Sequence, residues 1–281
     1  MQHVDELLDL LHLDAAGADH YVGQHPETLM QRTFGGQVMA QALAAVYETV
    51  DAARVAHSLK GYFLRPGSTD APIDYFVERT RDGGTFSTRR IQAVQRGKEI
   101  FLMTASLKVP EEGLEHTERP AVEPLPPDEC PPLAQVLGER SRRAAEMWER
   151  EWAAVEARFV PTQPVARGGA RMQAWIRSHG DLPDDPRVHQ MVLAYASDLT
   201  LLGVTTVPHP YTFGQPQLQM ATVDHSMWFH RPLRADQWVL YDQSSPNAAN
   251  GLGFATGRLY DEQGVLGAST SQEGLIRIVG S

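Results

Sequence analysis

The apolar residues of this chain fall into stretches of two kinds, one with helical spacing and one typical of strands. Two stretches are rich in Ala and Leu and poor in charge, residues 37–50 and residues 187–203, and both are predicted to be helices. The first follows a Gly-Gly pair, and the second follows Pro186 and ends at Gly203, which are ordinary start and stop signals. Because so few of their residues are charged, we expect each helix to be covered on most sides.

Runs typical of strands follow each helix, and together they form an internal repeat. Each copy has a first run, a polar turn around Arg-Pro, a second run, and two long strands joined by a Gly turn. Three pairs of residues keep a nearly constant separation: His57 and His225 at 168 residues, Arg65 and Arg231 at 166, and Gly97 and Gly264 at 167. An apolar helix followed by an antiparallel sheet, twice over, predicts an α+β fold in which each sheet wraps a helix.

The segment between the two copies has a different composition. Residues 110–132 hold seven of the 19 prolines and seven acids, which indicates an extended connector. Residues 133–158 show helical spacing and predict a helix packed across the outside, with Trp148 and Trp152 as packing anchors in preference to a ligand stack. The chain is therefore divided into three parts: an N-terminal half (1–109), a linker with an outer helix (110–165), and a C-terminal half (166–281).

Composition and charge narrow the classes of function. The chain is 42% hydrophobic and 21% charged, as globular proteins are, and its net charge of −10 argues against a nucleic-acid partner. A single cysteine, Cys130, excludes an internal disulfide and a multi-thiolate metal site. Residues 1–17 carry acids where a secretory leader has basic residues, and no run reaches about 18 apolar residues. We expect a cytoplasmic protein with no membrane partner, no metal and no cofactor.

Asp198 is the most informative position in the second predicted helix. It shares a stripe at i, i+4, i+7 and i+11 with Met191, Tyr195 and Leu202. A buried carboxylate needs either a partner, such as Arg231, or a function, and the stripe alone favours neither reading. The first helix carries no acid before Glu48, near its end. The acid therefore belongs to one half only, which favours a functional role.

Thr222 and Gln272 lie on the inward faces of two predicted strands. Threonine is a good strand former and is most often nothing more. Gln272 lies beside small or apolar residues and needs a hydrogen-bond partner, but contact with solvent at a sheet edge explains such a residue more often. Spacing alone assigns a role to neither residue.

Six blocks of the sequence resemble the acyl-CoA thioesterase II family, the TesB-type enzymes: RTFGGQVMAQAL, HSLKGYFLRPG, RRIQAVQRGKEIFLMTAS, PDDPRVHQMVLAYASDL, ATVDHSMWFHRP and ASTSQEGLIR. The resemblance extends from about Leu7 to Arg277 and is most specific in DHSMWFHRP. It implies a double hotdog, two helix-wrapped antiparallel sheets fused in one chain, that hydrolyses fatty acyl-CoA to fatty acid and CoA. It also implies a hydrolytic site made by an Asp on the second helix, a Thr or Ser just before the DHS block and a Gln in the last strand. These positions match Asp198, Thr222 and Gln272.

A mechanism consistent with these residue types has Asp198 as general base and Thr222 and Gln272 as the groups that hold a water. Burial raises the pKa of such a carboxyl and hydrogen bonds to it lower that pKa, and the sequence leaves the balance open. The backbone amides of Gly36 and Gln37, at a helix start, are candidate oxyanion donors, although the two glycines before Gln37 serve equally well as a tight turn.

Three further residues are candidates for substrate binding. His57 is one, although its repetition as His225 favours a structural hydrogen bond common to both sheets. Arg89 and Arg90, with Arg96 nearby, form a cationic cluster that could meet the phosphates of CoA. Side chains at 89 and 90 face opposite ways in a strand, so at most one of them does so.

Other enzyme classes lack their motifs, since the chain has no G-x-S-x-G elbow, no metal-ligand pair at the usual spacing and no glycine-rich phosphate loop. Two alternatives stay open: a hotdog enoyl-CoA hydratase, which needs a His soon after the helix acid, and a noncatalytic acyl-CoA binding module. After Asp198 no histidine occurs before His209. A fused double hotdog already contains the pairing that single hotdogs gain by dimerising, which permits a monomer, but we expect a dimer or tetramer formed through sheet faces.

Overall fold

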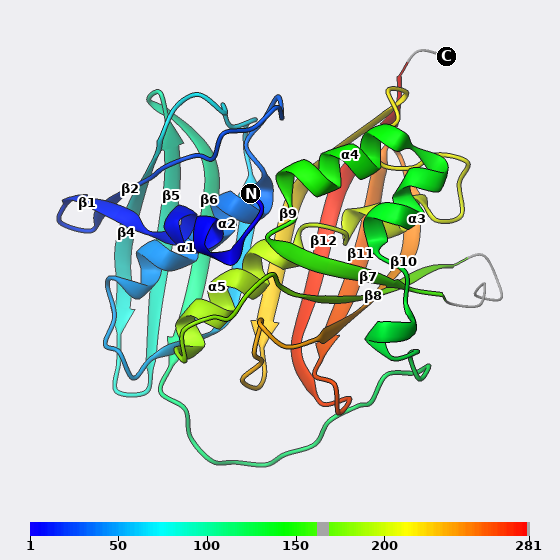
Figure 1. The fold of residues 1–281 in the computed structure, drawn as a ribbon. Helices are drawn as coiled ribbons and strands as arrows, with labels where there is room; N and C mark the ends of the chain where they lie inside the picture. Colours follow the sequence, from blue (N-terminus) through cyan, green and yellow to red (C-terminus); the bar gives the residue numbers. More distant parts are fainter. Residues whose placement is uncertain (162–168, 280–281) are drawn as a thin grey trace.

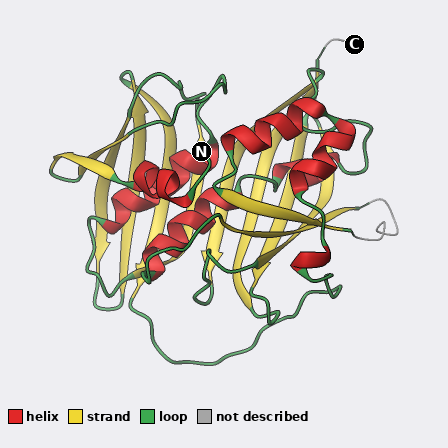
Figure 2. Cartoon of the chain, viewed as in Figure 1, coloured by secondary structure: helices red, strands yellow, loops and turns green. Residues whose placement is uncertain are grey.

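One continuous antiparallel sheet runs through the whole molecule, with the helices in front of it in the view of Figures 1 and 2. The structure is a computed structural model, and it describes residues 1–161 and 169–279. Its strands lie in the order β1-β2-β4-β5-β6-β3-β9-β12-β11-β10-β8-β7. The N-terminal strands are β1 (Leu13–Gly17), β2 (His20–Gly23), β3 (Val55–Phe63), β4 (Ile73–Asp82), β5 (Phe86–Gln95) and β6 (Lys98–Lys108). The C-terminal strands are β7 (Val155–Val160), β8 (Ala170–Ser178), β9 (Leu218–Phe229), β10 (Val239–Ala249), β11 (Leu252–Tyr260) and β12 (Leu266–Ile278).

Five α-helices and two short 3-10 helices occur in the described part of the chain. They are α1 (Val4–Leu11), α2 (Gly35–Tyr47), η1 (Pro127–Glu129), α3 (Leu133–Arg140), α4 (Arg142–Glu151), α5 (Pro186–Ser197) and η2 (Leu202–Thr206). None of these helices is long and apolar enough to cross a membrane.

The two halves meet edge to edge in the middle of the sheet. Strands β3 and β9 pair antiparallel from Ser58 opposite Trp228 to Tyr62 opposite Asp224. The two sheets predicted from the repeat are therefore joined into one, and each half still curves around its own long helix. No helix or strand occurs between β6 and η1, where the connector runs as a long loop from one half to the other (Figure 1).

Helices α2 and α5 pack side by side and run in opposite directions. Every residue of α2 after Gly35 is buried, which confirms that this helix is covered on most sides. At one end of the pair, the Arg187 guanidinium at the start of α5 donates to the backbone oxygens of Asp51 and Arg54, just beyond α2. At the other end, a Cβ atom on Gly36 would lie 2.4 Å from the Tyr195 carbonyl oxygen, late in α5. Each helix start thus faces the end of the other helix.

The predicted helices are longer than the observed ones. Helix α5 ends at Ser197, so Asp198 is its C-cap residue and not an interior position, and Gly203 belongs to the separate helix η2. The helix predicted over residues 133–158 is wrong in its extent, because Ser141 breaks it and caps α4 by accepting a hydrogen bond from the Ala144 N–H. Its last residues form β7, which lies inside the segment assigned to the linker but pairs with β8 of the C-terminal half. The boundary between residues 165 and 166 lies outside the described residues.

Hydrogen bonds at the end of each central strand give the true register of the repeat. The N–H groups of Leu64 and Arg65 donate to the Ile100 carbonyl, and those of His230 and Arg231 donate to the Gly267 carbonyl. This register relates the two halves by 166 residues in β3 and β9, and by 167 in β6 and β12. The counterparts of Thr222, His225 and Gln272 in the first half are then Ala56, Leu59 and Ala105.

The match between His57 and His225 is therefore a coincidence of sequence. By register, His57 corresponds to Val223, and both residues sit at a break in the strand pairing. The His57 ring bonds Ser106 on β6, whereas the His225 ring bonds Ser197 on α5. The prediction of one structural hydrogen bond common to both sheets is wrong, because the two histidines lie at different positions of the sheet.

Arg89 is a buried structural residue, with only 1% of its surface exposed. Its guanidinium donates to the Thr49 hydroxyl and carbonyl, to the Arg81 carbonyl and to the Asp82 carboxylate, which lies 2.7 Å away. It thereby satisfies backbone oxygens just past the end of α2. Arg90 is exposed, which confirms that the two side chains face opposite ways.

Replacing Arg89 with Met is expected to lower the free energy of unfolding by about 3 kcal/mol, because several buried acceptors lose their donor. Chemical denaturation at pH 7 measures this change. Arg90→Met removes the same charge from the exposed neighbour and should stay within about 0.5 kcal/mol of the parent protein. Equal effects of the two substitutions would contradict the structural role of Arg89.

Candidate active site

The Asp198 carboxylate lies at the junction of the two halves, where α5 ends and α2 begins. Its side chain is only 5% exposed. Helix α2 has no side-chain cap at Phe34 and no acid in its first turn, and the Gly36 N–H donates to Asp198 instead. The carboxylate thus supplies the negative charge that a helix start favours. The fit is tight, since a Cβ atom on Gly35 would lie 2.6 Å from Asp198 Oδ2.

Two side chains from neighbouring strands hold the same carboxylate. Thr222, on β9, donates from Oγ1 to Asp198 Oδ1 at 3.2 Å. Gln272, on β12, donates from Nε2 to Asp198 Oδ1 and to Thr222 Oγ1, the second at 2.8 Å. The three residues therefore form one closed hydrogen-bonded group. They are far apart in the sequence: Asp198 and Thr222 are separated by 24 positions, Thr222 and Gln272 by 50, and Asp198 and Gln272 by 74.

Burial decides the protonation behaviour of Asp198. Loss of hydration raises the pKa of its carboxyl to about 6, against the lowering effects of the hydrogen bonds from Gln272, Thr222 and Gly36. The balance that the sequence left open is thus set by burial. At neutral pH the group is mostly ionised and has a pKa close to the working range of a general base.

His225 is a buried neighbour of this group that sequence reasoning set aside. Its Nε2 lies 3.0 Å from the Ser197 hydroxyl, and its Nδ1 lies 3.9 Å from Asp198 Oδ1. Burial lowers its pKa to about 3, so the ring is neutral and the 3.9 Å separation is not an ion pair. The feature of the sequence that could have identified His225 as part of the site is its place in the DHS block, three residues after Thr222.

A large cavity of about 1110 Å³ opens against Asp198 and Thr222. Its volume is slightly above the usual range of ligand pockets, which leaves room for a large ligand. Gln272 is completely buried and does not line the cavity. Aromatic and aliphatic side chains make up most of the wall, among them Phe63, Leu137, Trp148, Trp152, Phe159 and Phe213. The two tryptophans belong to the core, as predicted, and they also face this cavity.

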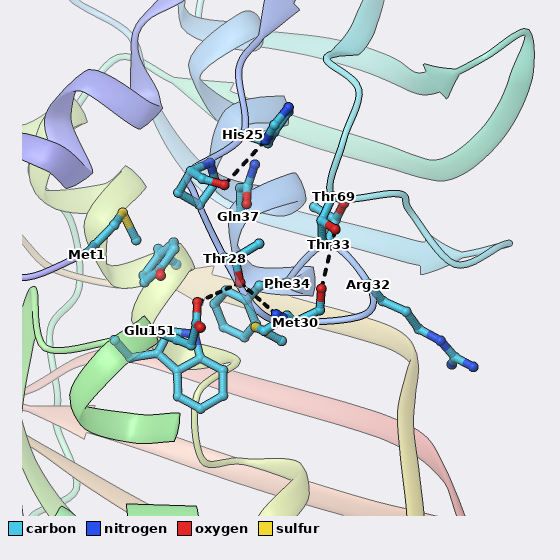
Figure 3. A pocket seen from close by; sticks show the side chains of 13 residues that line it. Met1, His25, Thr28, Met30, Arg32, Thr33, Phe34, Gln37, Thr69 and Glu151 are labelled. Carbon is cyan, nitrogen blue, oxygen red and sulfur yellow. Dashed lines mark hydrogen bonds between the residues drawn. The ribbon is translucent and has the colours of Figure 1, made fainter. Parts of the chain in front are cut away.

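A much smaller pocket adjoins the cavity and shares Phe34 and Trp152 with it (Figure 3). Here the buried Glu151, at the end of α4, accepts hydrogen bonds from the Thr28 hydroxyl at 2.6 Å and the Leu29 N–H at 3.2 Å. These contacts fasten the loop that leads into α2 onto helix α4. The start of α2, and with it the environment of Asp198, is held from both halves.

Two family models match the chain. The acyl-CoA thioesterase model matches residues 146–275, and the acyl-CoA thioesterase N-terminal domain model matches residues 25–108. The chain is also 35% identical to acyl-CoA thioesterase 2 of Haemophilus influenzae over 98% of each protein. It belongs to the acyl-CoA thioesterase II family. The chain is accordingly a thioester hydrolase.

Solved structures agree with this assignment. The crystal structure of the acyl-CoA thioesterase II TesB2 from Mycobacterium marinum is 41% identical, with a TM-score of 0.83 over 96% of this chain and 97% of that one. A conserved protein with a hot dog fold from Alicyclobacillus acidocaldarius is 18% identical, with a TM-score of 0.79 over 97% of this chain and 98% of that one, and this likeness shows the fold alone. The predicted double hotdog is confirmed.

The thioesterase brings some of the predicted site residues together and leaves others apart. Gly36 lies at the site, and its amide donates to the Asp198 carboxylate. The Gln37 side chain donates to the Gln24 carbonyl and lines only the smaller pocket. These contacts involve the Gln37 side chain and leave its backbone amide, at the start of α2, as the remaining candidate oxyanion donor.

The candidates for substrate binding on the N-terminal sheet lie away from the cavity. None of His57, Arg89 and Arg90 lines it. Arg89 has no access to a phosphate because it is buried and its N–H groups are occupied. Arg90 lies 3.6 Å from Glu78 and Arg96 lies 2.7 Å from Asp70, so these two cations have acidic partners. Other arginines line the cavity, namely Arg32, Arg65, Arg140 and Arg171, of which only Arg65 stood out in the sequence, as an anchor of the repeat.

Gly35→Ala is expected to lower kcat of the thioesterase at least tenfold, because the new methyl group would displace the Asp198 carboxylate from its hydrogen bonds. Thioester hydrolysis by the purified variant measures the effect. Gly203 lines the same cavity and has no atom within 4 Å of an added Cβ, so Gly203→Ala is the matched control and should retain activity. Full activity of the Gly35 variant would show that the close approach is not required.

Proposed function

We propose that this thioesterase hydrolyses fatty acyl-CoA to a free fatty acid and CoA with a water activated by Asp198. The observation that supports the proposal best is a buried carboxylate with a raised pKa that opens onto a large, mostly apolar cavity. An acyl chain suits the apolar wall, and the thioester carbonyl would then lie against Asp198 and Thr222. The relatives named as acyl-CoA thioesterases support the same substrate class.

Thr222 and Gln272 have different parts in this proposal. Thr222 faces the cavity, and its hydroxyl donates to Asp198 while it accepts from Gln272. One lone pair of its oxygen is left to accept a proton of the attacking water, whose other proton points to Asp198. Gln272 cannot touch that water from its buried position, so it is a positioning residue that fixes the other two.

The reaction then follows from this arrangement. The water oxygen attacks the carbonyl carbon as its proton passes to Asp198, and a tetrahedral intermediate forms. When the intermediate collapses, the bond between carbon and sulfur breaks, and the proton on Asp198 is transferred to the leaving sulfur. The products are the fatty acid and the CoA thiol, and Asp198 is again ionised.

The geometry argues against the two alternatives. A hotdog hydratase needs a histidine that reaches the substrate next to the acid, but His225 is completely buried and does not line the cavity. A binding module has no need for a carboxylate buried without a cationic partner, because such a group destabilises the fold. A cytoplasmic location, a role in fatty-acid metabolism and assembly into a dimer or tetramer remain predictions of the sequence.

Asp198→Asn is expected to lower kcat for octanoyl-CoA at least a hundredfold, because the amide cannot accept the proton of water. Release of free thiol, followed colorimetrically, measures turnover. The variant should be no less stable at pH 7 than the parent, because it removes the burial of a charge. Asp224→Asn is the control and should retain activity, because Asp224 lies on β9 with Thr222 but is paired with Tyr62 and Glu273 and does not line the cavity.

Activity is expected to rise with pH, to be half-maximal near pH 6 and to level off about one pH unit higher. The pKa of Asp198 is raised to about 6, and the base works only when it is ionised, so protonation below this pH removes activity. The pH profile of kcat/KM measures this transition. A Gln272→Leu variant should shift its midpoint upward, because the hydrogen bond from Gln272 favours the ionised carboxylate. A profile that is flat between pH 5 and pH 8 would contradict the assignment of the base.

A further inference from the structure

We propose that Arg32 and Arg65 form the binding site for the phosphate groups of CoA, at one end of the large cavity. This inference rests on the proposed function, since it concerns how the same substrate is held. It also sets the direction of the substrate, with CoA at the end of these two arginines and the acyl chain at the other.

Both arginines lie a short distance along the chain from the thioester position. Gly35 and the Phe63 ring meet beside the Asp198 carboxylate. Arg32 precedes Gly35 by three residues, and Arg65 follows Phe63 by two, so each backbone lies within roughly 10 Å of these points. In bound acyl-CoA, the pantetheine arm would connect a phosphate held by these arginines to the thioester beside Asp198.

Two hydrogen bonds hold the segments that carry these arginines together. The Thr33 N–H donates to the Gly67 carbonyl at 3.1 Å, and the Thr33 hydroxyl donates to the Ser68 carbonyl at 2.8 Å. Residues 32–34 and 65–67 therefore form one joined rim, and all of them line the cavity. The two guanidinium groups extend from a fixed base and not from two independent loops.

Both side chains are exposed and have N–H groups to spare. Arg32 makes no hydrogen bond or ion pair with any residue in the described part of the chain, and Figure 3 shows it pointing away from Glu151 and Thr28. Arg65 gives one N–H to the Glu99 carbonyl at 2.6 Å, which fixes its direction, and has no carboxylate partner among the described residues. Guanidinium groups that have no carboxylate partner bind phosphate well, often through two N–H groups at once.

The second half of the repeat supports this reading by contrast. Arg231 is the counterpart of Arg65, but its guanidinium donates to the Leu266 and His116 carbonyls and lies 3.9 Å from Glu115. In the second copy, residues of the connector between the halves thus contact the guanidinium group of Arg231. The first copy stays open, on the rim of the cavity that contains Asp198.

Helix α4 runs beside the cavity and contributes Trp148 to its wall. Its last residue, Glu151, contacts the loop at Thr28 and Leu29, next to Arg32. Its first residue, Arg142, lies nine residues earlier, which is about 14 Å along a helix. Arg140, just before α4, therefore lies at the far end, beside the carboxylate-bearing Glu139 and the apolar side chains of α3. Arg140 is a single cation beside apolar side chains of α3 here, whereas Arg32 and Arg65 are two cations on one joined rim, so the rim suits a polyanion better.

The test compares octanoyl-CoA with octanoyl-pantetheine, which has the same thioester and no phosphate. For the parent enzyme kcat/KM should favour octanoyl-CoA, and this preference should fall as NaCl is raised. In the double variant Arg32→Gln/Arg65→Gln, KM for octanoyl-CoA should rise about tenfold or more with little change in kcat. The preference should largely disappear, together with its dependence on salt.

Two single variants are the controls. Arg140→Gln removes a cation from the opposite end of the cavity, and Arg90→Gln removes one outside it. Both should keep the preference for CoA over pantetheine, which separates a local site from a general effect of charge. Thermal midpoints show whether each variant is folded, and all four substituted arginines are exposed.

Binding of CoA itself, measured by calorimetry, tests the arginines without any turnover. The Kd of the double variant should exceed that of the parent about tenfold or more. If the parent binds CoA through these arginines and hydrolyses neither thioester, the proposed function fails and this site stands. If the double variant retains the parent's CoA preference and Kd, or if Arg140→Gln loses them equally, the site is not here.

Discussion

The structure depends on one buried carboxylate at the place where the two halves of the molecule meet. Asp198 follows the last residue of α5 and lies against the start of α2, whose Gly36 amide donates to it. Burial alone would make such a charge costly, and two strand side chains and a helix start compensate for it only in part. The remaining imbalance raises the pKa of the carboxyl to about 6. A base that works near neutral pH is therefore a consequence of how the halves are packed.

Duplication made two equivalent ends of the helix pair, and only one of them carries this chemistry. The positions that hold Thr222, His225 and Gln272 in the second half hold alanine or leucine in the first. At the other end of the helix pair, the Tyr47 hydroxyl and the Gln190 side chain fill the space and accept from the Ala56 N–H. The two halves thus share a framework but not a function, since one end is closed by structural hydrogen bonds and the other opens onto the cavity.

The arginines show a similar division. This acidic protein uses Arg89 inside its first half to satisfy backbone oxygens, and it pairs Arg90 and Arg96 with carboxylates. The cations that remain open toward the cavity come from the turn after β3, from the loop before α2 and, at Arg140, from the end of α3. A cluster of arginines in the sequence is therefore a poor guide to an anion site, because its availability depends on which residues lie opposite in space.

The sequence by itself determined the fold class, the duplication and the family, because periodicity and long motifs can be recognised in the sequence without knowing which distant residues are in contact. It also singled out Asp198, since an acid on an apolar stripe is a local conflict that spacing reveals. Only the tertiary structure decided that Asp198 caps one helix while it faces another, that Gln272 stands behind Thr222, and that His57 and His225 are not counterparts. Helix ends, strand register and the exposure of Arg65 or Arg89 depend on residues far apart in the chain, and no local pattern records those contacts.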